Sequence, residues 1–436
     1  MRHLIAGLLL AASLLPAPPS AAAGELAPVE QQIVHAVRAG LPDGLSLLET
    51  AVNQNSGTMN FDGVRAVADL FAPRFEALGF AVTWKPGEAW GRAGHLVAER
   101  RGAENALHVL FIGHLDTVFE PDSPFQTYQR LSETQASGPG VTDMKGGVVV
   151  MLLALGALQD AGILDQLTVS VVLTGDEEKS GKPLDLARAD LTEAARKADI
   201  AIGFEDGDGN PATAVVSRRG YSSWMLTTRG KAAHSSQIFR EDLGSGAIYE
   251  MARILHAFQE QLSGIAYLTA NPGALLGGTE VVYDSEATRG NASGKTNVIA
   301  QTAVAHGDLR ALTLPQREEA KALMLEIAAQ NLPHTQSELV FTDGYPPLAP
   351  SEGNLELLSL FSQASMDLGH GPGEAVDPAR AGAADISFTA GLVRMALDGV
   401  GLMGSGGHTV DEVADLTTLS IQAERMAVTL YRLSHR

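Results

Sequence analysis

Five short polar segments of this 436-residue chain place imidazole or carboxylate groups where predicted strands end. The residues that carry these groups are His114, Asp116, Asp143, Glu177, Glu178, Glu205 and His408. Zn²⁺ binds histidine nitrogen and carboxylate oxygen, and two ions about 3.5–4 Å apart can share a bridging carboxylate and a bridging water. The set therefore predicts a two-metal hydrolytic site with one additional carboxylate.

Each of these residues has a simpler structural interpretation when it is taken alone. Asp143 stands just before a predicted helix, where an aspartate is a common N-cap. Glu177 and Glu178 could be solvated loop charges, although adjacent carboxylates repel each other unless a metal ion holds one and a reacting proton needs the other. Most of the 12 histidines are expected to be ordinary surface or core residues. Only the joint order and spacing of the segments favours the metal site.

The polar segments follow apolar runs that are typical of buried strands. Such runs occupy residues 107–112, 167–173 and 200–204, and residues 147–161 have the composition of a buried helix. Strands that alternate with helices predict an α/β fold with a doubly wound, mixed sheet and helices on both faces. Ligands of such sheets collect at the carboxyl ends of the strands, which is where the polar segments lie.

A second domain is predicted inside the first. From residue 215 the expected order is strand, helix, strand, strand, helix and strand, the βαββαβ pattern of ferredoxin-like domains. These elements are expected at residues 222–228, 245–262, 279–283, 297–305, 314–331 and 338–341. The α/β pattern then returns with a helix at 354–368, a strand at 393–397 and a helix at 416–433. We therefore assign residues 24–214 and 336–436 to a catalytic domain and residues 215–335 to an inserted domain.

The composition excludes several classes of function. The chain has 51 acidic and 31 basic residues and a formal net charge of -20, which argues against nucleic acid or an anionic membrane surface as a partner. It has no cysteine, so disulfides and cysteine nucleophiles are excluded and every metal ligand must be nitrogen or oxygen.

The first 23 residues have the pattern of a cleavable secretory signal peptide. Arg2 precedes an apolar run at residues 4–15, and Ala21, Ala22 and Ala23 form a small-residue cleavage pattern. A membrane anchor is the alternative, but the run is shorter than the roughly 20 residues that span a bilayer. We expect cleavage after Ala23 and a periplasmic or secreted protein with no membrane partner.

Six segments together resemble the ordered motifs of one metallopeptidase family. They are residues 113–118, 138–147, 174–181, 203–206, 230–235 and 406–411. That family holds aminoacylases, glutamate carboxypeptidases, acetylornithine deacetylases and succinyl-diaminopimelate desuccinylases, and the chain is most similar to the glutamate carboxypeptidases. The resemblance covers nearly all of the chain after residue 23. It implies two Zn²⁺ ions per subunit, for which Co²⁺ or Mn²⁺ could substitute.

The resemblance also implies how the metal ligands divide between the two ions. Asp143 would bridge them, His114 and Glu205 would complete one site, and Glu178 and His408 would complete the other.

The resemblance also implies roles for residues that are not metal ligands. Asp116 would orient His114, and the peptide bond after Asp143 would be cis. Glu177 would be the general base that takes a proton from the bridging water and delivers it to the leaving amine.

The inserted domain would be a lid that also forms a homodimer. His234 would reach from this lid into the partner subunit's active site and stabilise the oxyanion of the tetrahedral intermediate.

Three residues are expected to bind the substrate. Asn297 and Arg310 would hold its carboxylate, a role that suits arginine because its planar fork can bind a carboxylate bidentately. A structural ion pair with Asp308 is the alternative for Arg310. Arg380 could be a further substrate contact.

The chain departs from the glutamate-specific members at two places. Those members use a lysine shortly after the glutamate ligand and an arginine on the segment that returns from the lid. Residues 205–211 and 344–347 contain no cation, so strict selectivity for a C-terminal glutamate is not expected.

The sequence thus predicts a secreted di-zinc metallohydrolase that cleaves an amide bond next to a free carboxylate. We expect a carboxypeptidase that acts on short peptides or N-acyl amino acids. An aminoacylase or deacylase is the nearest alternative, because it cleaves the same kind of bond beside the same carboxylate. An inactive relative that only binds a ligand is another, but Glu177 argues against it because binding needs no additional base.

Overall fold

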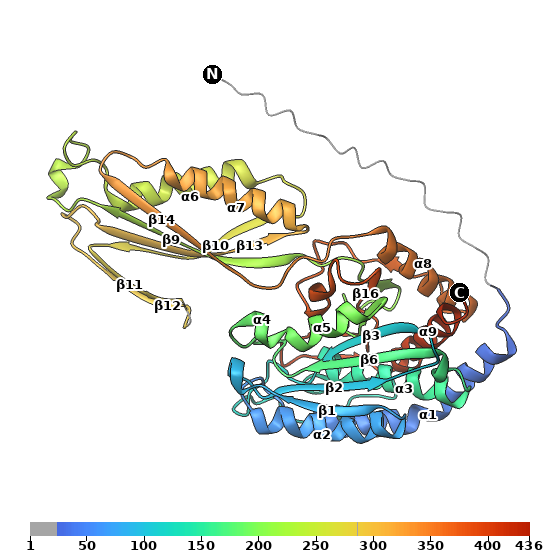
Figure 1. Cartoon of the computed structure of the whole chain (residues 1–436). Coiled ribbons are helices and arrows are strands. Elements are labelled where there is room, and N and C mark those ends of the chain that lie inside the picture. The colour runs from blue at the N-terminus through green and yellow to red at the C-terminus, as the bar shows by residue number, and fades with distance from the viewer. Residues whose placement is uncertain (1–23, 286) are drawn as a thin grey trace.

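The computed structural model describes residues 24–285 and 287–436. The predicted signal peptide, residues 1–23, lies outside the described residues. Figure 1 shows two lobes, a larger one built from both ends of the described chain and a smaller one formed by its middle part.

The larger lobe is built on a six-stranded mixed sheet. Its strand order is β1 (Ala81–Pro86), β2 (Gly94–Arg100), β6 (Leu167–Thr174), β3 (Leu107–His114), β7 (Ile200–Gly203) and β16 (Met395–Leu397). β6, β3, β7 and β16 run parallel, whereas β1 and β2 pair antiparallel at one edge. The predicted strands at 107–112, 167–173 and 200–204 are confirmed as β3, β6 and β7. β1 and β2 contain too many polar and charged residues to be predicted from an apolar run.

Helices cover both faces of this sheet, as predicted for a doubly wound fold. On one face pack α1 (Pro28–Asn53), α2 (Phe61–Ala77), α3 (Gly147–Asp160), α8 (Glu352–Asp367) and α9 (Thr417–Leu433), and on the other lies α5 (Ala189–Lys197) beside α4 (Leu184–Ala187). Along β3, Val109 and Phe111 pack into the first layer, while Leu110 and Ile112 pack into the second. A strand buried on both faces therefore reads as a continuous apolar run.

The segment Val141–Asp160, which contains α3, is apolar and long enough to cross a membrane, with a mean hydropathy of 1.7. However, 83% of its most apolar part is buried inside the lobe. We therefore interpret it as a core helix.

Short strands complete the lobe. β17 (Gly404–Ser405), β18 (Val413–Asp415), β5 (Gln135–Ser137) and β4 (Gln129–Arg130) form a small antiparallel sheet, and β8 (Thr213–Ala214) pairs with β15 (Glu374–Ala375). The pairing of β18 with β5 brings the loop between β17 and β18 next to the turn that follows β5.

The smaller lobe has the predicted βαββαβ order. Its antiparallel sheet has the order β10 (Thr269–Gly278), β13 (Thr302–Ala311), β9 (Gly220–Gly230) and β14 (Thr335–Asp343), and its helices are α6 (Gly246–Leu262) and α7 (Leu314–Ala329). Both helices lie on one face of this sheet (Figure 1), where Trp224 and Leu226 of the sheet pack against Phe258 and Met324 of the helices.

Two predictions for this lobe are wrong. The predicted strand at 279–283 is β11 (Glu280–Asp284), which among the described strands pairs only with β12 (Arg289–Ser293), in a separate hairpin. Its expected place in the sheet belongs to β10, whose proline and three glycines obscure the strand pattern. The predicted domain boundary at residue 335 falls on the first residue of β14, so the inserted domain extends to Asp343.

Candidate metal centre

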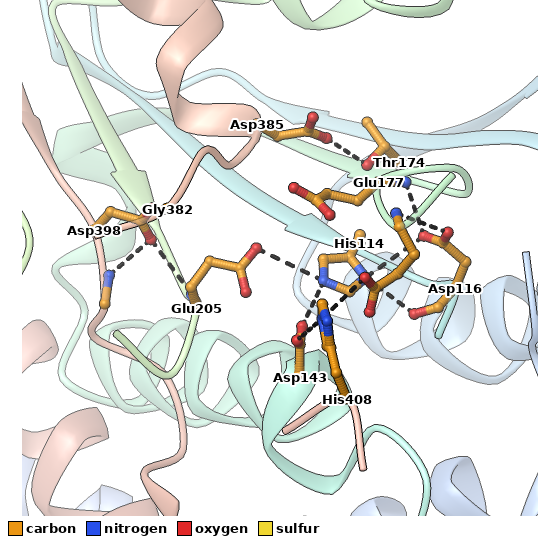
Figure 2. Close-up of polar contacts among 12 residues, drawn as sticks. His114, Asp116, Asp143, Thr174, Glu177, Glu205, Gly382, Asp385, Asp398 and His408 are labelled. Atoms are coloured by element: carbon orange, nitrogen blue, oxygen red, sulfur yellow. Dashed lines mark hydrogen bonds and ion pairs between the residues drawn. The ribbon is translucent and has the colours of Figure 1, made fainter. Parts of the chain in front are cut away.

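The structure brings the five predicted metal ligands together at the carboxyl ends of the parallel strands, and Figure 2 labels His114, Asp143, Glu205 and His408 among them. His114 is the last residue of β3, Glu178 lies in the loop after β6, and Glu205 follows β7. Asp143 comes from the turn before α3, and His408 comes from the loop between β17 and β18. Because β18 pairs with β5, which leads into that turn, the last two ligands approach each other from distant parts of the sequence.

Asp143 lies between two groups of ligands. Its Oδ1 is 2.9 Å from His114 Nε2, and the same nitrogen is 3.6 Å from Glu205 Oε1. Its Oδ2 is 3.0 Å from His408 Nε2, which is 3.1 Å from Glu178 Oε2. Each oxygen of this one carboxylate therefore faces a separate pair of histidine and glutamate, as a bridging ligand requires.

The donor atoms fit divalent ions such as zinc. Two ligand atoms that are each about 2.0–2.1 Å from a tetrahedral Zn²⁺ lie roughly 3.3 Å apart. The separations of 2.9–3.6 Å within the two groups bracket that value. The ligand atoms of His114, Asp143 and Glu178 also lie within 4.8 Å of one another. Imidazole nitrogen and carboxylate oxygen are donors that zinc and related ions accept.

A buried carboxylate fixes the turn that carries Asp143. Glu412 accepts hydrogen bonds from the main-chain N–H groups of Gly140, Thr142 and Asp143 at 2.9, 2.9 and 3.2 Å. Gly140 has a φ of 73°, a left-handed conformation that favours glycine. The peptide bond between Asp143 and Met144 is cis, as the resemblance implies. Glu412 is a functional residue that the sequence did not reveal, because a single loop glutamate has no distinguishing pattern.

Asp116 lies against His114, as predicted, and contacts it most closely through its main chain. Its main-chain oxygen is 3.0 Å from His114 Nδ1, whereas its carboxylate Oδ1 is 3.5 Å away. Its carboxylate accepts hydrogen bonds from the Thr58 hydroxyl at 2.6 Å and from the N–H groups of Glu177 and Glu178 at 3.0 and 3.2 Å. The carbonyl thus orients the imidazole so that Nε2 faces the other ligands, while the carboxylate holds the loop after β6.

Asp398 supports Glu205 and was also missed by the sequence analysis. It follows β16 directly and is fully buried. Its Oδ1 accepts a hydrogen bond from the Glu205 N–H at 3.4 Å, and its Oδ2 pairs with Arg218 Nε at 2.7 Å. The sequence could have indicated Asp398 as a site residue, because it follows a parallel strand in the same way as the predicted ligands.

The crowded carboxylates have shifted pKa values. Burial raises the pKa of Glu178 to about 7, and the negative charge of Asp143 adds to this rise. Burial also raises the pKa of Glu177 well above its usual range, with a further contribution from Asp385. Burial raises the pKa of Glu205 in the same direction. Positive charge from divalent ions would stabilise these groups as anions.

The pKa values of the two histidines are raised as well, but by contacts with the carboxylates rather than by burial. Hydrogen bonds to Asp143 and Glu178 raise the pKa of His408 to about 11. Burial lowers the pKa of His114, but the charge of Glu205 and hydrogen bonds to neighbouring aspartates outweigh it and leave the pKa well above its usual value. A proton and a metal ion compete for the same imidazole nitrogen, so metal binding at this centre depends on pH.

A cleft of about 870 Å³ opens from the metal centre toward the inserted domain. Its lining includes Glu177, Glu178 and His408 at the centre and Tyr221, Arg310 and Tyr345 beyond it. Arg310 Nε donates to Asp308 Oδ2 at 2.8 Å, so the ion pair considered as its alternative role is present. Its side chain is still 37% exposed, so the guanidinium can also contact a substrate in the cleft.

The structure does not bring His234 and Asn297 to the metal centre. Both are exposed on the inserted domain, and neither is among the described residues that line the cleft. They are neighbours, because the Ser235 N–H donates to the Asn297 carbonyl at 2.9 Å and His234 bridges to Val298. Their predicted roles would need a second subunit or a movement of this domain.

Arg380 forms an ion pair with Asp208 at 3.1 Å and is 65% exposed. Asp208 belongs to the 205–211 loop, which has no cation of its own. The guanidinium of Arg380 therefore brings a positive charge to this loop from a distant segment. A contact of Arg380 with the substrate stays a prediction.

Known proteins share sequence patterns with most of this chain. The sequence pattern described as peptidase family M20/M25/M40 matches residues 110–432. Carboxypeptidase G2 from Pseudomonas sp. (strain RS-16) is 25% identical over 373 residues, which cover 84% of this chain and 83% of that protein.

Two solved structures share the fold. The aminopeptidase PepT from Bacillus cereus has a TM-score of 0.71 and 18% identity, and the alignment covers 90% of this chain and 98% of that one. The YXEP protein of Bacillus subtilis, described as a dinuclear metal binding peptidase from the M20 family, has a TM-score of 0.63 and 14% identity over 91% of this chain and 99% of its own. The family match covers most of the chain, and the motif resemblance is thereby confirmed: this protein belongs to peptidase family M20/M25/M40.

Proposed function

We propose that the protein is a di-zinc hydrolase that cleaves the amide bond next to a free carboxylate, as a carboxypeptidase on short peptides or N-acyl amino acids. The observation that carries this proposal is the position of Asp143 between two separate pairs of histidine and glutamate, with Glu177 beside them in the cleft. The similarity to carboxypeptidase G2 over most of both chains supports the same class of reaction.

The five ligands would hold two zinc ions, with Asp143 shared between them. When bound, such ions polarise a carbonyl oxygen and lower the pKa of water. Glu177 lines the cleft next to the ligand Glu178. It takes the proton from the attacking water and delivers it to the nitrogen of the leaving amine, because an amine leaves readily only after it is protonated.

The substrate carboxylate would meet cations on the inserted domain. Arg310 lines the same cleft as Glu177 and Glu178 and can bind a carboxylate with its planar fork. His234 and Asn297 would come from a second copy of the chain in a homodimer, since both are exposed and outside the described lining of the cleft. The N-terminal pattern supports export to the periplasm or beyond the cell.

An aminoacylase or deacylase activity is the alternative that the cleft also permits. The 205–211 and 344–347 segments carry no cation that would demand a glutamate side chain. Rates on dipeptides and on N-acetyl amino acids with the same C-terminal residue would separate the two activities.

One substrate panel tests the proposal. Purified protein loaded with Zn²⁺ is assayed on dipeptides, on N-acetyl amino acids and on the same compounds with an amidated C-terminus. We expect hydrolysis of free acids and little hydrolysis of the amides, because an amide cannot bind Arg310 as an anion. Absence of hydrolysis of every free acid by protein with two bound zinc ions would refute the proposed function.

A further inference from the structure

The loop that carries Glu177 is held by a buried arginine. Arg188 lies between α4 and α5 and is 1% exposed. Its Nη1 donates to Asp176 Oδ1 at 2.7 Å, and its Nη2 donates to the Asp176 carbonyl at 3.1 Å. Its Nε donates to Asp385 Oδ1 at 2.7 Å, and the other oxygen of Asp385 accepts from the Thr174 hydroxyl at 2.6 Å. Two aspartates and one arginine therefore fix the start of this loop.

A tyrosine from a distant segment joins this network. The Tyr345 hydroxyl donates to the carbonyl oxygen of Glu177 at 3.1 Å. It accepts hydrogen bonds from Ser180 Oγ at 3.0 Å and from Arg188 Nη2. A phenol hydroxyl has one hydrogen to donate and two lone pairs to accept with, so these three bonds use its full capacity. The hydroxyl thus connects the main chain of Glu177 to Arg188, which holds the loop.

Tyr345 also lies where the inserted domain joins the catalytic domain. It follows the end of β14 by two residues, on the segment that returns from the inserted domain. Its ring stacks on Tyr221, near the start of β9, with centroids 5.9 Å apart, and packs edge-on against Phe388 of the catalytic domain at 4.9 Å. Tyr345 is 3% exposed. Both connections between the domains therefore meet at this side chain.

We propose that Tyr345 is a positioning residue for the general base. Its hydroxyl holds the main chain of Glu177, so the position of Glu177 depends on the junction with the inserted domain. This inference rests on the proposed function, because it assigns Glu177 the proton transfer. The physical reason is that a side chain can deliver a proton efficiently only from a main chain that is fixed, and small displacements of a catalytic group cost large factors in rate.

Tyr345→Phe tests this inference, because it removes only the hydroxyl and keeps the ring packing. We expect kcat to fall between about 10- and 100-fold while KM changes less than about twofold, since the substrate contacts are intact. Two metal ions per subunit and cooperative unfolding well above the assay temperature would show that the loss is not a loss of fold or ligands. Ser180→Ala removes one of the three partners and should lower kcat by a smaller factor.

Tyr431→Phe is the matched control, because it removes a hydroxyl from α9, which lies on the other side of the sheet. A Tyr345→Phe enzyme whose kcat lies within about twofold of both wild type and this control would overturn the inference. An increase in KM at unchanged kcat would also overturn it, because that pattern indicates a substrate contact. Wild-type hydrolysis of the free-acid panel tests the proposed function separately.

Discussion

The metal centre and the substrate-binding part of the inserted domain differ in how completely one chain builds them. At the centre, all five ligands contact other polar groups of the same lobe. The carboxylate of Asp143, for example, contacts His114 and His408, and its main chain belongs to the turn that Glu412 fixes. On the inserted domain, His234 and Asn297 are exposed and contact none of those ligands in the described structure. Arg310 is intermediate, because it lines the cleft but is paired with Asp308.

This difference teaches that the two halves of the proposed reaction have different structural requirements. Metal binding and proton transfer need groups that one folded lobe preorganises. In the proposed reaction, His234 and Asn297 would arrive with another subunit or with domain closure, whereas Arg310 already lines the cleft of the same chain. Mutations in the two regions should therefore differ in size, in the kinetic constant they change and in whether a second subunit can compensate for them.

The largest effect is expected from Glu177→Ala. Because Glu177 is not among the predicted ligands, the variant should keep two metal ions while kcat falls by about 10³-fold, within the range of general acid–base catalysis. Steady-state kinetics and elemental analysis measure both properties. Glu193→Ala, at an exposed position on α5, is the matched control. Activity comparable to that of the control would contradict the assignment of Glu177 as the base.

A somewhat smaller effect is expected from His234→Ala. Loss of one oxyanion donor typically lowers kcat by about 10²–10³-fold. In an equal mixture with Glu177→Ala subunits, hybrid dimers would contain one complete site, and activity should recover to about a quarter of the wild-type value for random pairing. His256→Ala, an exposed histidine of the same domain, is the control. No recovery at any mixing ratio would show that His234 does not act on the other subunit's site.

A moderate effect on KM rather than kcat is expected from Arg310→Ala. A charge-assisted hydrogen bond to the substrate carboxylate contributes about 1.5–3 kcal/mol, so KM should rise roughly 10- to 150-fold. Arg240→Ala removes an exposed arginine that pairs with Asp242 and serves as the control. If KM for free acids is unchanged, the ion pair with Asp308 is the main role of Arg310.

The smallest effect concerns the pH dependence of metal binding. In the metal-free protein, hydrogen bonds to Asp143 and Glu178 raise the pKa of His408 to about 11, so this imidazole is protonated at neutral pH. Zn²⁺ binds only the neutral ring, so binding should release this proton and the affinity should fall about tenfold for each pH unit of acidification per proton released.

Calorimetric titration in buffers with different ionisation enthalpies measures this proton release. His408→Gln should release fewer protons than wild type, whereas His435→Ala at the exposed C-terminus should not differ. A zinc affinity that is constant between pH 6 and pH 8 would contradict the protonated state of the metal-free centre.

The parts of the fold that the sequence predicts are those with a local signal. β3 and β6 are buried on both faces and therefore read as apolar runs, and the ligands could be placed because they stand at the ends of such runs. β10 has no such signal, because a proline and glycines interrupt it and pairing with β13 decides its structure. β11 was placed in the sheet instead, because its sequence Glu-Val-Val-Tyr-Asp has the local strand signal that β10 lacks.

Glu412 and Arg188 could not be predicted as supporting residues, because their partners are remote in the sequence. Glu412 binds Gly140 across 272 positions, and Arg188 reaches Asp385 across 197. Neither pair leaves a trace in spacing or periodicity. For Arg310 the sequence offered two roles, a substrate contact and an ion pair with Asp308. Its position in the cleft is compatible with both roles, so the structure does not choose between them.

The central claim is that Asp143 bridges two metal ions, and anomalous diffraction from crystals loaded with Zn²⁺ tests it most directly. We predict two peaks about 3.5–4 Å apart on either side of the Asp143 carboxylate. One should lie against His114 and Glu205 and the other against Glu178 and His408. No peak, or a single peak away from Asp143, in crystals grown with excess zinc would contradict the account.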